Sequence, residues 1–151
     1  MPPEPPPEVR EMSAIVVGYD GTEGARVALD QATALAKAHG IGVHIVFAYD
    51  RVVVGGENRD LDQVVGERAR TVLAEGLAHV IESQVPAETE FVEGAPAQAL
   101  VDAADRLDAP YIVVGSYGER PLKGALVGAT PHKLLWLSDR PVVVVRLPEE
   151  D

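Results

Sequence analysis

Short apolar runs alternate along the chain with longer segments in which apolar residues recur every three or four positions. Short continuous runs are typical of strands buried on both faces, whereas the longer spacing is typical of helices that pack one face on a core. The runs predict five strands, at residues 14–17, 43–48, 89–92, 111–114 and 142–146.

The segments between these strands have helical spacing, and they predict helices at residues 24–39, 61–83, 96–107 and 131–138. Gly40 should end the first helix, and Pro96 suits the first turn of the third. For the last helix, Thr130 is the expected cap and Pro131 the first helical residue. Strands that alternate with helices predict one α/β domain, with a parallel sheet covered by helices on both faces.

The composition fits a single soluble domain: 46% of the 151 residues are hydrophobic and 25% are charged. We expect a disordered proline-rich tail at residues 1–12, the domain at 13–147 and an acidic tail at 148–151. The net charge of -11 argues against nucleic acid or a membrane surface as partner, since both require a basic face. No apolar run approaches the roughly 20 residues that span a bilayer, and cysteine is absent, so we expect a cytoplasmic protein.

Glycines follow the first and the fourth predicted strands. Gly115 and Gly118 come at the end of the fourth strand, and Gly128 precedes the last helix. Glycine lets backbone amides approach an anion, and a helix N-terminus presents unpaired N–H groups, so this arrangement predicts a phosphate cradle. Ligands of parallel sheets bind beyond the carboxyl ends of the strands, where the strand order reverses. If the first and fourth strands are neighbours, both glycine loops therefore open on one crevice.

The loop after the first strand carries one carboxylate, Asp20, for which two roles stay open. Asp20 can accept hydrogen bonds from a ribose or an adenine amino group, or it can cap the following turn or helix. In the glycine loop, Arg120 and Lys123 are candidate phosphate ligands or simply solvated charges. His132 lies at the start of the last helix, where a solvated position is the simpler interpretation.

The sequence contains no recognisable catalytic constellation. The P-loop pattern G-x-x-x-x-G-K-[ST] and the dinucleotide pattern G-x-G-x-x-G are both absent. There is no G-x-S-x-G nucleophile elbow, and Ser116 has no histidine or second carboxylate in a plausible order to activate it. The four histidines lack metal-ligand spacing. We therefore predict a protein that is not an enzyme and holds no metal ion through its own side chains.

The glycine spacing resembles the nucleotide-binding pattern of the universal stress protein family, G-x2-G-x9-G-[ST]. Gly115, Gly118 and Gly128 match this pattern at both spacings. The resemblance extends from about residue 13 to residue 146, and further similar segments are residues 16–22, 94–96 and 141–145. It implies a Rossmann-like, five-stranded parallel sheet in the order 3-2-1-4-5.

The resemblance also implies that an adenine nucleotide is bound and not turned over. ATP is the first candidate, with Mg²⁺ as its companion, and AMP or cyclic AMP are the alternatives. The loop after the first strand would hold ribose and base, strand ends would border the adenine, and the glycines would contact ribose and phosphates. The implied binding residues are Gly18, Tyr19, Asp20, Ala48, Val114, Gly115, Gly118, Gly128, Ala129 and Thr130.

One position departs from the family pattern, because Ala129 stands where a serine or threonine hydroxyl would bind phosphate. Losing one such hydrogen bond costs roughly 0.5–1.5 kcal/mol, which weakens binding about ten-fold. Pro131 removes another N–H donor, and Thr130 can substitute only if its hydroxyl does not cap the helix. The alternative function is therefore a dimeric interaction protein whose pocket has lost its nucleotide.

The final predicted strand, which begins at Val142, lies at a sheet edge in the implied order. An apolar edge with unpaired backbone groups promotes association, and the resemblance implies that it pairs with a second copy of the chain. We therefore expect a homodimer that acts in stress response through ligand-dependent regulation.

Overall fold

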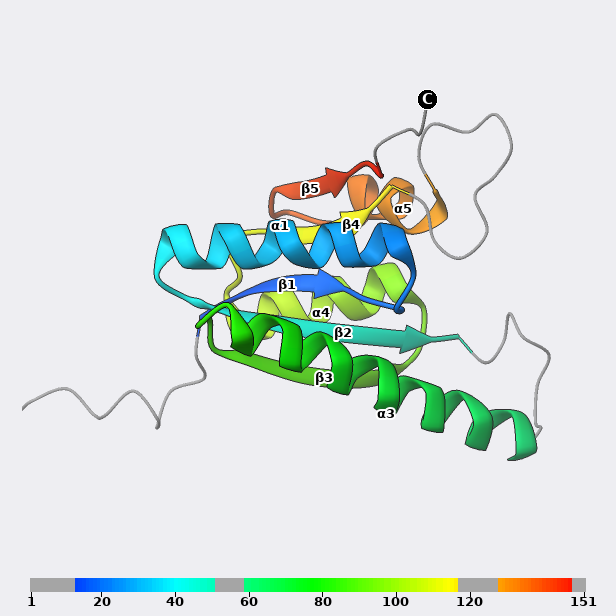
Figure 1. The fold of residues 1–151 in the computed structure, drawn as a ribbon. Helices are drawn as coiled ribbons and strands as arrows, with labels where there is room; N and C mark the ends of the chain where they lie inside the picture. Colours follow the sequence, from blue (N-terminus) through cyan, green and yellow to red (C-terminus); the bar gives the residue numbers. More distant parts are fainter. Residues whose placement is uncertain (1–12, 51–58, 117–127, 148–151) are drawn as a thin grey trace, which may run out of the picture.

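The computed structural model describes residues 13–50, 59–116 and 128–147 (Figure 1). Its elements, in chain order, are β1 (Ala14–Gly18), α1 (Glu23–His39), β2 (Gly42–Tyr49), α3 (Arg59–Glu82), β3 (Ala87–Glu93), α4 (Pro96–Leu107), β4 (Ile112–Gly115), α5 (Ala129–Leu137) and β5 (Val142–Val145). All the predicted strands and helices are present, and their ends differ from the prediction by at most two residues. The two expected tails lie outside the described residues.

The described strands form one parallel sheet in the order β3-β2-β1-β4-β5. This confirms the parallel α/β fold and the strand order that the family resemblance implies. β1 pairs with β2 on one side and with β4 on the other, where Val17 lies opposite Val113. The order of the strands reverses between β1 and β4, so the carboxyl ends of these two strands are neighbours.

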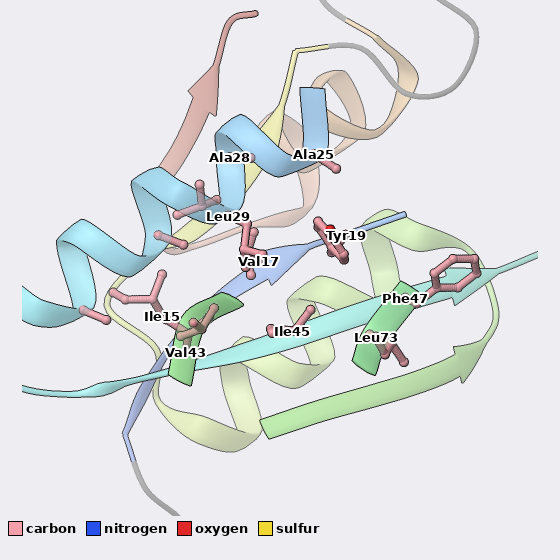
Figure 2. Packing of buried hydrophobic residues seen from close by; sticks show 14 of the residues in the cluster. Ile15, Val17, Tyr19, Ala25, Ala28, Leu29, Val43, Ile45, Phe47 and Leu73 are labelled. Atoms are coloured by element: carbon pink, nitrogen blue, oxygen red, sulfur yellow. The ribbon is translucent and has the colours of Figure 1, made fainter. Parts of the chain in front are cut away.

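Helices cover both faces of the sheet (Figure 1). On one face, Ile15 and Val17 of β1 pack with residues of α1 and α3, as Figure 2 shows for part of this cluster. On the other face, Val16 packs with Leu100 of α4 and Leu134 of α5. Successive residues of a strand point to opposite faces, so a strand covered on both sides must be apolar at every position. That requirement explains the continuous apolar runs of the sequence.

The ends of α1 follow the signals in its sequence. Thr22 is the N-cap, and its Oγ1 accepts a hydrogen bond from the backbone N–H of Ala25 at 3.3 Å. Gly40 ends the helix in the left-handed conformation, with φ 67°, which glycine adopts without steric cost. The predicted stop at Gly40 is therefore confirmed.

The start of α5 differs from the prediction. The helix begins at Ala129 with Gly128 as its N-cap, so Thr130 is not the cap and Pro131 is the third helical residue. Proline is tolerated throughout a first helical turn, because the N–H groups of that turn have no partner within the helix. Pro131 thus indicates the first turn of the helix correctly, but it does not determine at which residue the helix begins.

A polar cluster lies on the α4 side of β2 and β3. The buried His44 places its Nε2 atom 2.7 Å from Oε1 of Glu90, and Arg106 of α4 donates a hydrogen bond to the same oxygen. Burial opposes ionisation of Glu90, yet the hydrogen bonds from His44 and Arg106 outweigh it and hold the pKa of Glu90 below its ordinary value. The cluster ties β2, β3 and α4 together.

Candidate functional site

The carboxyl ends of β1 and β4 lie next to each other at one edge of the sheet. Their strands are adjacent and parallel, with Val16 opposite Ile112 and Val17 opposite Val113. The first residues beyond β1 and β4 therefore lie side by side, at the point where the strand order reverses. The predicted condition that the first and fourth strands are neighbours is therefore met.

The N-terminus of α5 is joined to the end of β4. The N–H of Gly128 donates a hydrogen bond to the carbonyl of Ser116, at 2.5 Å, and the N–H of Ser116 donates to the carbonyl of Val145, at 2.9 Å. Gly115 and Gly128 are thereby brought together although residues 117–127 separate them in sequence. Gly118, Arg120 and Lys123 lie outside the described residues.

Gly115 has a structural requirement of its own. A Cβ atom added there would lie 2.9 Å from the carbonyl oxygen of Gly24 and 3.1 Å from its carbonyl carbon. Both contacts are with backbone, which cannot rotate away as a side chain can. The end of β4 therefore packs directly on the first turn of α1, and this contact alone requires glycine at position 115.

The residues just before Asp20 are packed into the fold. A Cβ atom at Gly18 would approach Cδ1 of Leu100 to 3.2 Å, and the side chain of Tyr19 is only 5% exposed. The N–H of Tyr19 donates to the carbonyl of Val46 at 2.8 Å, and its ring faces Gly76 of α3. The aromatic ring of Tyr19 thus belongs to the core, and Figure 2 shows it there.

Asp20 caps the turn that leads into α1. Its Oδ1 atom accepts hydrogen bonds from the N–H of Thr22 at 3.0 Å and from the hydroxyl of Thr22 at 2.6 Å. Thr22 in turn caps α1, so Asp20 positions the cap residue. The capping role that the sequence left open is present, and it uses Oδ1. A ligand-binding role for Asp20 would use Oδ2.

Ala48 and Val114 can offer only backbone groups to a ligand. Ala48 is paired with Val92 near the end of β2. Val114 is 4% exposed and is part of the core on the α4 side of the sheet. Neither side chain carries a polar atom, so any polar contact of these residues must come from a main-chain N–H or C=O group.

The first turn of α5 presents backbone donors that no side chain caps within the described residues. Gly128 occupies the N-cap position, so the hydroxyl of the half-buried Thr130 is not committed to capping. Pro131 has no N–H, and the N–H of His132 is bonded to the carbonyl of Gly128 at 3.2 Å. The available donors are therefore the N–H groups of Ala129 and Thr130 and the Thr130 hydroxyl.

Sequence reasoning missed the packing role of Gly115, because no spacing rule links it to Gly24.

Within residues 13–50, 59–116 and 128–147, no three His, Cys, Asp or Glu side chains come together as a metal site. No helix in that part of the chain is long and apolar enough to cross a membrane. Among the described residues, this edge of the sheet therefore offers the Asp20 carboxylate, the Thr130 hydroxyl, several main-chain groups and the start of α5.

Residues 12–146 match the Universal stress protein family. The chain belongs to this family. The match covers nearly the whole domain, and it confirms the family resemblance that the glycine spacing indicates.

Individual relatives agree with this assignment. A universal stress protein of Thermus aquaticus, from the QAH/OAS sulfhydrylase 3' region, is 32% identical over 136 residues, which cover 87% of this chain and 97% of that protein. Stress response protein NhaX of Bacillus subtilis (strain 168) is 26% identical over an alignment of 160 positions, which covers 87% of this chain and 96% of NhaX.

A solved structure of a universal stress protein in complex with cAMP superposes with a TM-score of 0.70 at 26% sequence identity. The superposition covers 90% of this chain and 98% of the other. The two proteins therefore share the fold over most of this chain.

Proposed function

We propose that this universal stress protein binds an adenine nucleotide in the crevice at the carboxyl ends of β1 and β4, and that it regulates a stress response without catalysing a reaction. The observation that carries the proposal is the hydrogen bond from Gly128 to Ser116, which sets the N-terminus of α5 against the end of β4, the strand next to β1. The related universal stress protein solved with cAMP supports the choice of an adenine nucleotide.

In this proposal, ribose and base lie on the β1 side of the crevice. Oδ2 of Asp20 accepts hydrogen bonds from the ribose hydroxyls, while Oδ1 keeps its bonds to Thr22. The main chain of Gly18, Tyr19, Ala48 and Val114 borders the adenine ring. Buried strand ends suit this task, because they leave only fixed backbone groups to face the base.

The phosphates lie on the α5 side of the crevice. Gly115, Gly118 and Gly128 allow close approach of the backbone, and the N–H groups of Ala129 and Thr130 point at the anion from the helix N-terminus. ATP is the first ligand we propose, with Mg²⁺ carried by its phosphates, and AMP and cyclic AMP are the competing ligands. A cytoplasmic location belongs to the same proposal.

Calorimetric titration with ATP, ADP, AMP and cyclic AMP tests this function. Asp20→Asn keeps an oxygen acceptor for the turn and removes the charge. It should weaken nucleotide binding about ten-fold or more, because hydrogen bonds to charged groups contribute roughly 1.5–3 kcal/mol. The exposed Asp139→Asn removes the same charge outside the crevice and serves as the control. If none of the four nucleotides produces binding heat, the proposal is wrong.

Ala129 and Pro131 favour a second candidate, a dimeric interaction protein that no longer binds nucleotide, because both remove phosphate donors. β5 lies at the sheet edge, and its four valines are only partly buried. We propose for either candidate that β5 pairs with the β5 strand of a second copy. Light scattering at micromolar concentration should then give twice the mass of one chain, and the mass of a single chain would contradict the dimer.

A further inference from the structure

A groove of about 430 Å³ lies between α1 and α3, a size that suits a small ligand. Gly21 and Arg26 line it on one side. On the other side, one face of α3 contributes side chains at helical spacing, namely Val64, Glu67, Arg68, Thr71, Val72 and Glu75. The groove therefore combines two guanidinium groups with two carboxylates and two valines.

Gly21 links this groove to the candidate site, since it directly follows Asp20 in the chain. Its φ of 81° is in the left-handed region, and a Cβ atom there would lie 3.0 Å from Cγ2 of Val72. Glycine thus lets α3 pack closely on the loop after β1. Figure 1 shows the N-terminal part of α3 extending past the end of the β2 arrow, at the edge of the sheet where this strand has its carboxyl end.

Neither arginine of the groove is held in an ion pair by a carboxylate of the described residues. Within the described part of the chain, the arginine ion pairs are those of Arg106 and Arg140, and neither Arg26 nor Arg68 takes part in one. Oε1 of Glu67 accepts a hydrogen bond from the amide of Gln63, at 3.3 Å. Two exposed guanidinium groups on facing helices thus keep their fork of N–H donors for another acceptor.

We propose that this groove is a phosphoryl-binding site, in which Arg26 and Arg68 donate to the phosphoryl oxygens and Glu75 limits the affinity by repulsion. Guanidinium forks match phosphoryl geometry, which favours this ligand class over a simple halide. The site is distinct from the N-terminus of α5 and does not depend on adenosine binding at Asp20. The phosphoryl group belongs to a free phosphate compound, because the proposed function places the phosphates of a nucleotide held at Asp20 on the α5 side.

Calorimetric titration of the full chain with pyrophosphate, ATP and adenosine tests the site. Arg26→Gln and Arg68→Gln should each weaken binding of the phosphoryl probe about five-fold, the effect of one exposed charge at contact distance. Arg70→Gln removes the same charge from an exposed position of α3 outside the groove, so its affinities should equal those of the unmodified chain. Glu75→Gln should strengthen binding about three-fold, because it removes a repelling charge.

The three probes distinguish the sources of the phosphoryl group. If the arginine variants weaken pyrophosphate binding and leave ATP unchanged, the site takes a free phosphate compound. If they weaken ATP binding and leave pyrophosphate and adenosine binding unchanged, the groove takes the outer phosphates of the nucleotide, which would contradict an independent site. Arginine variants that match Arg70→Gln with both phosphate probes would overturn the inference. Loss of ATP binding in Asp20→Asn bears only on the proposed nucleotide site, so the two proposals fail separately.

Discussion

The two sides of the proposed crevice differ in whether their polar groups already have partners within the fold. On the β1 side, Tyr19 is in the core and Asp20 holds Thr22 through Oδ1, so these residues have partners within the fold. On the α5 side, the first-turn donors at Ala129 and Thr130 have no side-chain cap within the described residues. The β1 side is therefore maintained by folding alone, whereas the α5 side depends on a ligand or water to satisfy it. A glycine or aspartate at such a position therefore indicates a ligand only if its packing or capping role within the fold does not already explain it.

A substitution at Gly115 should have the largest effect on stability, and it tests whether this glycine is required by the fold or by a ligand. Gly115→Val adds a Cβ atom 2.9 Å from the Gly24 carbonyl oxygen, and the backbone of β4 or α1 must move to accept it. We expect the free energy of unfolding to fall by about 3 kcal/mol, in the upper range for overpacked sites. Urea denaturation measures the loss, and Gly115→Ala should cost less than Gly115→Val. A Gly115→Val protein of unchanged stability that no longer binds nucleotide would show that this glycine serves the ligand alone.

Ala129 tests the opposite side of the crevice. Ala129→Ser restores the hydroxyl of the family pattern at an exposed position, so it should strengthen ATP binding up to about ten-fold, the effect of one net hydrogen bond. Adenosine, which has no phosphate, should bind with unchanged affinity. Calorimetry with both ligands measures the difference, and Ala95→Ser, before α4, is a matched alanine-to-serine control near another helix start. Equal gains for ATP and adenosine would contradict a phosphate contact at this position.

The strands and helices were predictable from the sequence because their signals are local, whereas the strand order came from the family resemblance. A continuous apolar run such as residues 14–17 or 142–145 buries its side chains best in a strand that has helices on both faces. Gly40 marks a helix end because glycine adopts the left-handed conformation without steric cost. The site was predictable only in part, because its contacts join distant residues. Nothing near Gly115 in the sequence reveals its approach to Gly24, and the groove at Arg26 exists only where α3 packs on the β1 loop.

A substitution at Glu90 should have the smallest effect on stability. It tests whether the stability of the fold can change without a change in nucleotide affinity. Its pKa is held below the ordinary value of 4.5, since the hydrogen bonds from His44 and Arg106 outweigh the opposing effect of burial. The ionised carboxylate therefore stabilises the folded chain above about pH 4.5, and this contribution is lost as the pH falls through the lowered pKa.

Glu90→Gln should accordingly lower the free energy of unfolding at pH 7 by on the order of 1 kcal/mol, and the difference from the unmodified chain should shrink below pH 4.5. Urea denaturation across this pH range measures it, with the exposed Glu82→Gln as the control. Nucleotide affinity at pH 7 should be the same in both variants, because the cluster joins β2, β3 and α4 without reaching the loops at Asp20 and Gly128. A Glu90→Gln chain that binds nucleotide more weakly would mean that the β1 side of the crevice is not maintained by its local packing alone.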